Sequence, residues 1–592
     1  MSRYLLFVPF LLLTYVATAF QITPSWEAKV APSLLAAIDN GSNQLNFIIL
    51  LQPQADLRSA ATFSTKLAKG QFVFQELKRT AQESQTSVRN YLEAQGMSYH
   101  PFYIINAIQA KGTPLQLQQL AQEQIVKRII ANSPYQLEAP VLASDNAALT
   151  PQDIEWGIQM IGADQVWDMG YTGQGVVVGG QDTGYDWEHP ALKTKYRGYI
   201  DENNVDHNYN WHDAIHEIDS LNGDPIIDPT NNPCGLDVDA PCDDNNHGTH
   251  TMGTMVGTDG GENQIGVAPD ARWVGCRNME RGWGSPASYI ECFEWLMAPT
   301  DLSNENPNPA LAPHVFANSW GCPPIEGCDT SNFSIMETVV NTVKSSGVMV
   351  VVSAGNSGSE CSTVNTPAAI FENSFSVGAT RMNDTIAGFS SRGPVLVDGS
   401  MRMKPDISAP GHRVRSSVLG DQYSTFSGTS MAGPHVVGVV ALIISANPQL
   451  AGQVDIIEDI IIQSAVPKTT DQDCGNTSGT AVPNNTYGHG RINALAAVQL
   501  ALTATPTQDL TEVSPISVYP NPFTNTLQFD LTNLSGISEV TIFNGTGQNI
   551  GQWQLEGAAV QTLTVPQLAN GIYFYHLKNK TTAFQGKILK GQ

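Results

Sequence analysis

Three short segments of the chain each carry one side chain that could take part in nucleophilic catalysis. These are Asp182 in Asp182-Thr183-Gly184, His247 in His247-Gly248-Thr249-His250, and Ser430 in Gly428-Thr429-Ser430-Met431-Ala432-Gly433-Pro434. Each has a glycine close by, which allows backbone and substrate to approach the reactive group. An acid, a base and a hydroxyl in this order form one of the known arrangements of a catalytic triad. The set predicts a hydrolase with a serine nucleophile.

The chemistry gives each of the three a separate role. Ser430 is weakly nucleophilic alone, so His247 must take its proton as general base and later return it to the leaving amine. Asp182 would hold the imidazole in the correct tautomer and stabilise its charged form. Each motif alone could be an ordinary turn, but all three in order favour catalysis, because the base and its orienting acid work together.

Further motifs complete a specific pattern. They are Asn318-Ser319-Trp320-Gly321, Ser353-Ala354-Gly355-Asn356-Ser357-Gly358, Phe389-Ser390-Ser391-Arg392-Gly393-Pro394 and Lys404-Pro405-Asp406-Ile407-Ser408-Ala409-Pro410-Gly411. With them, the region from about Trp156 to about Ala497 resembles the subtilases, which are subtilisin-type serine endopeptidases, and within these the bacillopeptidase F-like group. A lone GxSxG would be weak, whereas these motifs together are long and specific.

The resemblance implies further site residues. It assigns the side-chain amide of Asn356, with the backbone N–H of Ser430, to stabilising the oxygen of the tetrahedral intermediate; otherwise Asn356 is a turn residue. It also implies two flanks of a substrate groove, in which a peptide binds as an added strand. Their substrate-binding residues are Gly282, Trp283, Gly284, Ser319, Trp320 and Gly321. Trp283 could equally be a packing residue.

The fold class follows from short, apolar runs. Gly175 to Val178, Ala271 to Gly275, His314 to Asn318 and Gly347 to Ser353 are each followed by a helix or loop, which predicts a parallel α/β sheet, subtilisin-like, with helices on both faces. Ligands lie at the carboxyl ends of such strands, where Asp182 and Asn356 fall. Gly179-Gly180-Gln181 departs from the apolar residues of many relatives and could loosen the strand before Asp182.

We expect five parts along the chain: a signal peptide (1–19), a propeptide (20–140), a catalytic domain (141–502), a linker (503–515) and a C-terminal β-sandwich (516–592). Arg3, an apolar run from Leu5 to Leu13, and Ala17-Thr18-Ala19 indicate the signal peptide; a membrane anchor would need a longer run. The linker is rich in Thr and Pro.

The βαββαβ pattern of residues 20–140 predicts a ferredoxin-like α+β domain. It comprises a strand at Leu45 to Leu51, a long helix near Thr62 to Gln95, strands around Tyr99 to Ala110, a helix near Pro114 to Gln122 and a strand at Ile125 to Ala131. This region resembles the propeptide of subtilases, an intramolecular inhibitor that chaperones folding, caps the cleft and is cut away. The mature chain would begin between Glu138 and Pro151; the alternative is an ancillary domain that is retained.

Residues 516–592 contain short alternating strands, which predict a β-sandwich. The segments are Ser517 to Tyr519, Thr526 to Asp530, Glu539 to Phe543, Gln561 to Val565, Gly571 to Leu577 and Phe584 to Leu589. The opening Ser517-Val518-Tyr519-Pro520-Asn521-Pro522-Phe523 resembles the sorting domain of type IX secretion substrates. The resemblance implies the type IX machinery as partner and a secreted or cell-surface location beyond an outer membrane. The alternative is a carbohydrate- or protein-binding module.

Eight cysteines in an exported chain suggest up to four disulfides, all in the catalytic part. Eight cysteines allow 105 pairings, and we single out only two local pairs, Cys234 with Cys242 and Cys322 with Cys328. None has CxxC metal spacing, so a zinc site is not expected.

Residues 141–514 carry 44 acidic and 15 basic side chains, whereas residues 20–140 carry 8 acidic and 10 basic side chains. An acidic surface repels phosphates, so we expect no nucleic-acid partner. Between Asp201 and Asn246 there are twelve acidic residues and no Lys or Arg. Asp237-Val238-Asp239 and Asp243-Asp244-Asn245-Asn246 could bind structural calcium, or belong to a solvated acidic insertion. The chemistry requires no cofactor.

His212 and His216 are spaced as on one helix face and could bind a transition metal, but no HExxH is present and a hydrated segment is the simpler interpretation; the sequence assigns no metal ligand.

Two functional classes remain. The first is a secreted serine endopeptidase, made as a zymogen, acting on protein and peptide substrates, with a monomer as the default. The second is a surface or adhesion protein that keeps the protease fold for binding; an intact triad favours the first.

Overall fold

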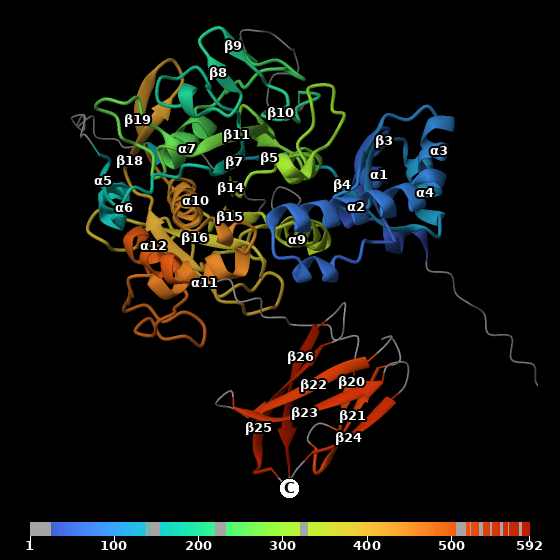
Figure 1. Cartoon of the computed structure of the whole chain (residues 1–592). Helices are drawn as coiled ribbons and strands as arrows, with labels where there is room; N and C mark the ends of the chain where they lie inside the picture. Colours follow the sequence, from blue (N-terminus) through green and yellow to red (C-terminus); the bar gives the residue numbers. More distant parts are fainter. Residues whose placement is uncertain are drawn as a thin grey trace, which may run out of the picture.

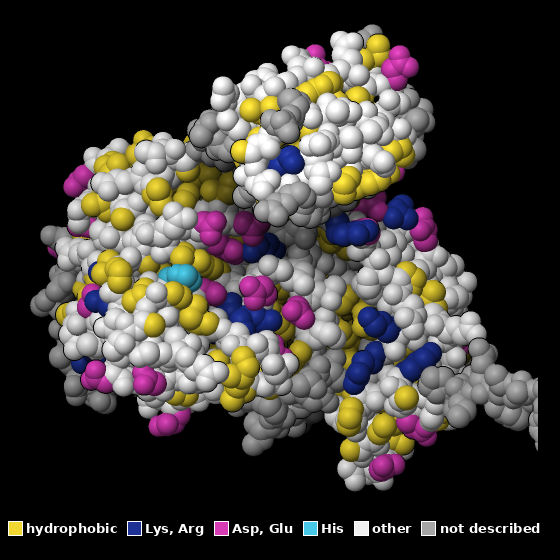
Figure 2. All heavy atoms as spheres, turned by 90° about the horizontal axis from the view of Figure 1, so that it is seen from below, with side chains coloured by type: hydrophobic (Ala, Val, Ile, Leu, Met, Phe, Trp, Pro, Cys, Tyr) yellow, Lys and Arg dark blue, Asp and Glu magenta, His cyan; other side chains and the backbone are white. Residues whose placement is uncertain are grey.

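The computed structural model describes residues 25–137, 141–142, 154–218, 232–319, 330–504, 517–520, 523–531, 537–544, 548–556, 560–565, 568–578 and 583–591. Figure 1 shows an N-terminal lobe, a large central domain and a C-terminal sandwich. Several Lys and Arg side chains gather on the N-terminal lobe in Figure 2, in keeping with its share of basic residues. The signal peptide, residues 505–515 of the expected linker and the Cys322–Cys328 pair lie outside the described residues, whereas Thr503 at the start of that linker is the last residue of a helix.

The N-terminal lobe has the expected ferredoxin-like order. A four-stranded antiparallel sheet, in the order β2-β3-β1-β4, is crossed by helices. The long helix expected near Thr62 to Gln95 is two helices that meet at Gln85, whose buried side-chain amide donates to the backbone oxygen of Phe102 at 2.8 Å. The elements are η1 (Trp26–Lys29), α1 (Pro32–Asp39), β1 (Leu45–Leu51), η2 (Arg58–Thr62), α2 (Lys66–Ser84), α3 (Thr86–Ala94), β2 (Tyr99–Phe102), β3 (Ala107–Gly112), α4 (Pro114–Gln122) and β4 (Val126–Ala131).

The central domain contains a seven-stranded parallel sheet in the order β10-β11-β7-β14-β15-β16-β17. Its strands are short and almost wholly buried, which explains their continuous apolar sequences. Their bounds are β7 (Val177–Asp182), β10 (Trp211–Asp213), β11 (Arg272–Arg277), β14 (Val315–Asn318), β15 (Met349–Ser353), β16 (Phe375–Thr380) and β17 (Ile407–Pro410).

Helices cover both faces of this sheet, as the sequence predicts. Val351 packs into one hydrophobic core with α7 and α10, whereas its neighbour Val350 packs into the other with α8 and α9. Helix α10 is apolar and long enough to span a membrane, but 89% of its length is buried inside this domain. The helices are α5 (Trp156–Ile161), α6 (Ala163–Asp168), α7 (His247–Val256), α8 (Pro286–Met297), α9 (Thr330–Ser345), α10 (Thr429–Ala446), α11 (Val454–Ser464) and α12 (Ala494–Thr503).

Smaller elements surround the sheet. Two three-stranded sheets, β12-β13-β5 and β18-β19-β6, each combine two strands of the central domain with a strand that follows the N-terminal lobe. The elements are β5 (Tyr135–Gln136), β6 (Val141–Leu142), β8 (Tyr199–Asp201), β9 (Asn204–Val205), β12 (Met279–Glu280), β13 (Trp283–Gly284), β18 (Val414–Val418), β19 (Gln422–Ser427), η3 (Lys193–Lys195), η5 (Pro309–Leu311) and η7 (Pro448–Leu450).

The glycines before Asp182 do not loosen β7, contrary to our expectation. The strand pairs with β11 and β14 along its length. A Cβ at Gly180 would lie 2.2 Å from the hydroxyl of Tyr185, so the glycine makes room for a buried tyrosine under the strand.

Three disulfides join described residues. Cys234–Cys242 confirms one of the two pairs that the sequence suggested. Cys276 on β11 pairs with Cys292 on α8, and Cys361 pairs with Cys474 across a separation of 113 residues. These two long-range pairs depend on the fold, which is why spacing along the chain did not reveal them.

The C-terminal part is a β-sandwich, as expected. A sheet β20-β21-β24 faces a sheet β23-β22-β25-β26 across a core that includes Phe529, Ile542 and Tyr575. The strand that the sequence analysis did not single out, β23, contains Gly551, where a Cβ would lie 2.4 Å from the ring of Trp553. The strands are β20 (Ser517–Tyr519), β21 (Thr526–Asp530), β22 (Ile537–Asn544), β23 (Asn549–Glu556), β24 (Val560–Thr564), β25 (Gly571–Lys578) and β26 (Ala583–Lys590).

Candidate active site

Asp182 and His247 meet at the carboxyl end of β7. Asp182 is the last residue of β7, and His247 is the first residue of α7, which packs against that strand. Oδ1 of Asp182 lies 2.7 Å from Nδ1 of His247, and both side chains are almost completely buried. The acid therefore fixes the orientation of the imidazole and leaves Nε2 as the atom that can accept a proton.

The protonation of His247 is set by two opposing effects. Burial disfavours the imidazolium, but the nearby Asp182 carboxylate, assisted by Asp243, outweighs burial and raises the pKa of His247 above its ordinary value. Nε2 of His247 is buried and has no hydrogen-bond partner among the described residues. A buried ring nitrogen without a partner is expected where a base awaits its proton donor.

A second carboxylate holds the Asp182 and His247 segments together. Asp243 is fully buried and accepts hydrogen bonds from the hydroxyls of Thr183 and Thr249, at 2.8 and 2.6 Å. Gly184 lets the two segments approach, because a Cβ there would lie 1.7 Å from the backbone oxygen of Cys242 and its φ is +109°. These contacts explain the threonines and the glycine of the two motifs.

Ser430 lies in the first turn of α10, the central helix of the domain. This helix packs against α7, which brings the helices of Ser430 and His247 side by side. Ser430 is 5% exposed. The N-terminus of a helix carries partial positive charge, which favours the negative oxygen that forms during acyl transfer.

Asn356 is attached directly to the beginning of the same helix. Its Oδ1 accepts from the backbone N–H of Thr429 at 2.8 Å and from the Thr429 hydroxyl at 3.0 Å. Since the oxygen is held by Thr429, the Nδ2 group faces the other way, and a Cβ at Gly428 would lie 3.6 Å from it. The amide donor thus lies beside the segment that carries Ser430, as an oxyanion donor requires.

One expected flank of the substrate groove is already occupied by a strand. β13, Trp283–Gly284, pairs antiparallel with β5, Tyr135–Gln136, at the end of the N-terminal lobe. The backbone N–H of Leu137 donates to the backbone oxygen of Gly282 at 2.7 Å. Gly282, Trp283 and Gly284 therefore bind an extended segment of the chain itself.

The other expected flank is described only in part. Ser319 is buried directly after β14, and its Oγ accepts a hydrogen bond from the hydroxyl of Ser353 at 3.2 Å. Trp320 and Gly321 lie outside the described residues.

Several described carboxylates of the acidic insertion are bound by other side chains of the chain. Asp243 binds the threonines above, Asp244 binds Arg277 at 2.7 Å, and Asp237 binds His216. Within residues 154–218 and 232–319, no group of three or more metal-ligating side chains is arranged to hold an ion. We derive no step through a metal.

His212 and His216 do not share a helix face, contrary to their spacing. His212 is in β10 and His216 follows it, yet Nε2 of each lies within 3.0 Å of the Glu291 carboxylate on α8. Their helix spacing is therefore fortuitous, and an acidic side chain 75 residues further along the chain brings them together.

Sequence reasoning missed Thr429, Asp243 and the strand β5. Thr429 was within the Ser430 motif, but its role depends on a residue 73 positions away. Tyr135–Gln136 carries no catalytic motif, so only its pairing with β13 reveals it.

The subtilase family model matches residues 173–490. The chain belongs to the subtilase family. Bacillopeptidase F from Bacillus subtilis (strain 168) is 35% identical over 515 residues, which cover 82% of this chain and 33% of that protein. Subtilisin Savinase from Lederbergia lenta is 30% identical over 349 residues, which cover 59% of this chain and all of that protein. This subtilase thus spans about a third of the length of bacillopeptidase F.

A solved structure supports the fold alone. The epidermin leader peptide processing serine protease from Staphylococcus aureus covers 78% of this subtilase and all of its own chain, with a TM-score of 0.54 and 15% identity. Residues 517–591 match the secretion system C-terminal sorting domain. The β-sandwich is therefore a sorting domain, which directs the protein to the cell surface or the extracellular space.

Proposed function

We propose that this subtilase is a secreted serine endopeptidase, made as a zymogen, that hydrolyses peptide bonds through Asp182, His247 and Ser430. The observation that carries the proposal is the 2.7 Å contact between Asp182 and His247 at the carboxyl end of β7, with Nε2 left for a proton donor. The alternative, a binding protein that retains the protease fold, would not need to keep this buried pair and its supporting carboxylate.

In the first step, His247 Nε2 takes the proton of Ser430 as the hydroxyl oxygen attacks the scissile carbonyl carbon. The imidazolium is stabilised by Asp182, which stays ionised. When the tetrahedral intermediate collapses, the same proton passes to the leaving amine and an acyl-enzyme remains. Water then repeats the sequence and releases the carboxylic acid product.

The negative oxygen of each tetrahedral intermediate is stabilised by the Asn356 amide and the backbone N–H of Ser430. The hydrogen bonds from Thr429 to Asn356 Oδ1 support this role, because they orient the amide with Nδ2 beside Gly428. A donor held in place before reaction needs no reorganisation as charge develops.

Residues 20–140 act as an inhibitory propeptide in this proposal. β5 pairs with β13 as a peptide substrate would, by adding a strand. Past residues 138–140, Val141–Leu142 pairs with β19, whose last residue, Ser427, comes three residues before Ser430. The chain thus pairs with the catalytic domain both before and after residues 138–140, which supports cleavage close to residue 140 and the five-part division of the chain.

Substrates are protein and peptide chains bound in extended form, and the Gly282, Trp283 and Gly284 strand binds their residues upstream of the cut. Ser319, Trp320 and Gly321 form the opposite wall. The enzyme acts as a monomer without a cofactor, and the type IX machinery recognises its sorting domain.

The test compares the full chain with Ser430→Ala. Wild type should hydrolyse casein, react with a fluorophosphonate at Ser430 and lose the residues before about Pro151 by intact mass; Ser430→Ala should do none of these. Ser445→Ala, at the other end of α10, is the matched control and should behave as wild type. A folded wild-type chain, freed of residues 20–140, that neither reacts nor cuts would refute the proposal.

A further inference from the structure

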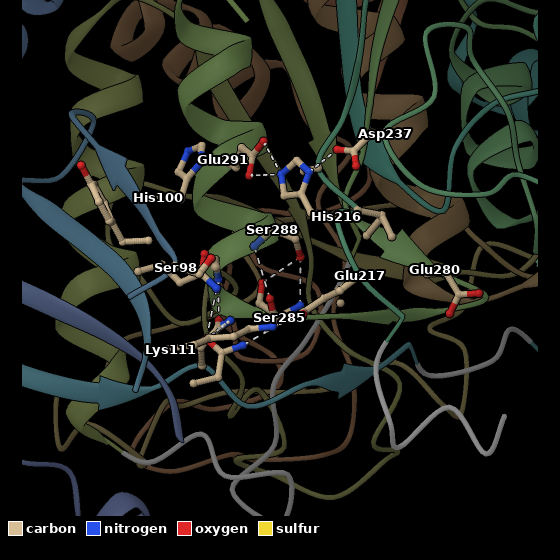
Figure 3. A pocket seen from close by; sticks show the side chains of 18 of the residues that line it. Ser98, His100, Lys111, His216, Glu217, Asp237, Glu280, Ser285, Ser288 and Glu291 are labelled. Atoms are coloured by element: carbon tan, nitrogen blue, oxygen red, sulfur yellow. Dashed lines mark hydrogen bonds and ion pairs between the residues drawn. The ribbon is translucent and has the colours of Figure 1, made fainter. Parts of the chain in front are cut away.

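A cluster of ionisable side chains crosses the interface between the N-terminal lobe and the catalytic domain. His100, on β2, lies close to Glu291, His216 and His212 of the catalytic domain, and Asp237 in turn contacts His216. We call these five the interface histidine cluster. In Figure 3 the Glu291 carboxylate lies between the rings of His100 and His216, and Asp237 contacts the far side of His216. His100 is the one histidine of residues 20–140.

His216 is held as a cation by the catalytic domain alone. Its Nε2 lies 3.0 Å from both oxygens of Glu291, and its Nδ1 contacts Asp237 at 2.5 Å. These hydrogen bonds, with Glu291 the larger effect, raise the pKa of His216 to about 10. Because both carboxylates belong to the catalytic domain, this cation does not depend on the N-terminal lobe.

His100 differs from His216, because its surroundings disfavour the charged form of the ring. Its ring stacks on that of His216, with centroids 6.3 Å apart and planes at 21°. Burial is the largest effect on His100; Glu291 attracts its charged form, whereas His216 and His212 repel it, and together these lower its pKa below the ordinary value. Glu291 is already shared by two imidazoles, since His212 Nε2 lies 2.8 Å from its Oε1.

The cluster borders a cavity of about 430 Å³ between the lobe and the catalytic domain. Lys111 of the lobe and Glu217 form an ion pair across the cavity, and Glu280, paired with Arg281, lines it as well. Glu294, one turn beyond Glu291 on α8, accepts from the backbone N–H groups of Tyr103 and Ile104. The cavity gives protons a route to His100, and the lobe is docked by contacts on both sides of it.

The same cavity reaches the substrate strand. Trp283 and Gly284, which pair with β5, line it together with His100 and His216. A change in the charge of His100 therefore occurs at the cavity that also borders the β5–β13 pairing, by which the lobe occupies the expected substrate groove.

We propose that protonation of His100 loosens the N-terminal lobe from the catalytic domain, so that the zymogen is held shut at neutral pH and opens under mildly acidic conditions. This inference rests on the proposed function, and it adds the regulation of the same site. The physical cause of the opening is the cost of removing a charged His100 imidazole from water at the interface, increased by repulsion from the His216 cation.

The direction of the pH effect on docking follows from the difference in the His100 pKa between the docked and the free lobe. A histidine whose pKa is lower when docked favours docking above its free value of about 6.5, and this contribution is lost as the pH falls through the docked value. His216 has the opposite sign, since its raised pKa keeps it charged throughout this range. Acidification below about pH 6.5 therefore acts through His100.

The experiment follows opening without relying on catalysis. Full-length Ser430→Ala, which cannot cut itself, is compared with Ser430→Ala carrying His100→Gln, by hydrogen exchange of the β5 and Leu137 amides between pH 7.5 and 5.0. Rates are divided by the intrinsic exchange rate at each pH. We expect exchange in the parent to rise by up to about tenfold per pH unit below 6.5, and His100→Gln to stay within about twofold across the range.

Two further variants separate charge from a general loss of packing. His100→Lys should be open already at pH 7.5, because its charge is permanent. His216→Gln removes the neighbouring cation and frees Glu291 to bind a protonated His100, so its pH dependence should vanish or reverse. His489→Gln, a half-buried histidine elsewhere in the catalytic domain, is the matched control and should follow the parent.

The outcomes are distinct. If His100→Gln opens with the same pH profile as its parent, or if the parent becomes more protected in acid, the inference fails. Exchange of β7 amides must stay constant, because their loss would mean acid unfolding of the whole domain and would also overturn it. The proposed function is judged separately, by fluorophosphonate reaction of Ser430 in the wild type, so pH-independent exchange with normal reaction refutes only the pH switch.

Discussion

The Oδ1 atom of Asn356 accepts hydrogen bonds from both the backbone N–H and the hydroxyl of Thr429, the residue that precedes Ser430. The proposed oxyanion donor and the nucleophile are therefore held in one unit at the N-terminus of α10. The Thr429 hydroxyl also accepts from the backbone N–H of Gly355 at 3.2 Å. A single hydroxyl thus fixes the loop after β15 to the helix.

Removing that hydroxyl should lower turnover without disturbing substrate binding. Thr429→Val nearly keeps the shape of the side chain. It removes the hydrogen bond from the hydroxyl to Asn356 Oδ1 and the hydrogen bond from the Gly355 N–H to the hydroxyl. With about 1 kcal/mol for each hydrogen bond, we expect kcat to fall roughly tenfold and KM to change less than about twofold. Thr429→Ser, which retains the hydroxyl, is the control. A fall confined to KM would contradict the positioning role.

The amide itself should matter more than the residue that positions it. Asn356→Ala removes the donor, and we expect kcat to fall about 100- to 1,000-fold, a magnitude known from subtilisin itself. Reaction of Ser430 with a fluorophosphonate should slow in parallel, since that reaction also develops negative charge on oxygen. Normal kcat in a folded Asn356→Ala protein would remove Asn356 from the site.

The activity of the mature enzyme should rise with pH. His247 must be neutral to act as base, and Asp182 raises the pKa of His247 above its ordinary value against the effect of burial. We therefore expect kcat/KM to increase through an apparent pKa above 6.5. Asp182→Asn should lower kcat by about 10⁴ and move this pKa downwards. An unchanged profile in Asp182→Asn would argue against the pairing.

The raised pKa of His247 also contributes to the stability of the folded protein, and this contribution has the opposite pH dependence to the activity. Because the pKa of His247 is raised in the folded state, its contribution to stability is complete below about pH 6.5 and is lost as the pH rises through the higher value. Activity and this part of stability thus change in opposite directions with pH.

The sequence singled out the proposed catalytic residues because each lies within a local motif. Asp182, His247 and Asn356 are fixed by strand ends and helix starts, so a few neighbouring residues identify them. The parallel sheet was predictable for a similar reason, since buried strands such as Met349–Ser353 are continuous apolar runs.

Features that depend on distant partners could not be predicted. The hydrogen bond from Thr429 to Asn356, the Cys361–Cys474 pair and the strand Tyr135–Gln136 join segments with no shared motif. The helix spacing of His212 and His216 pointed to a wrong local structure, because tertiary contacts with Glu291 decide their arrangement. Local patterns thus determine the elements, whereas contacts between elements determine how the residues around the site are arranged.

The Cys361–Cys474 disulfide should contribute strongly to stability. It closes 113 residues, and in the chain-entropy view a loop of that length restricts the unfolded chain by about 4 to 5 kcal/mol. We expect the double variant Cys361→Ser, Cys474→Ser to lower the thermal midpoint by roughly 5 to 15 °C. Calorimetry of Ser430→Ala protein avoids self-digestion. Removing Cys234–Cys242, with a separation of 8, should cost about half as much.

Glu294 should help to dock the N-terminal lobe. It is buried, and burial raises its pKa to about 8, although the backbone N–H groups of Ile104 and Tyr103 oppose that rise. In Ser430→Ala protein, Glu294→Ala should speed amide exchange at Tyr103 and Ile104 by about tenfold or more. Glu305→Ala, at an exposed position, is the control. Unchanged exchange would show that other contacts hold the lobe.

The side chains of β5, the strand that pairs with β13, lead to a prediction about which substrates the enzyme prefers. Tyr135 is 1% exposed, and its ring stacks on Tyr289 of α8 with centroids 6.2 Å apart and planes at 12°. Gln136, between Tyr135 and the buried Leu137, is exposed. A substrate that binds in the same register should therefore depend on its side chain at the Tyr135 position and not at the Gln136 position.

A quenched fluorescent peptide with the sequence of residues 133–142 tests this dependence on the mature enzyme. Burying an aromatic side chain contributes about 1.5 to 3 kcal/mol, so replacing the tyrosine by alanine should lower kcat/KM by about tenfold or more. Replacing the glutamine by alanine should change it less than about twofold. In Tyr289→Ala enzyme the tyrosine and alanine peptides should become nearly equal. Equal rates in wild type would mean that the chain's own strand binds in a register that substrates do not use.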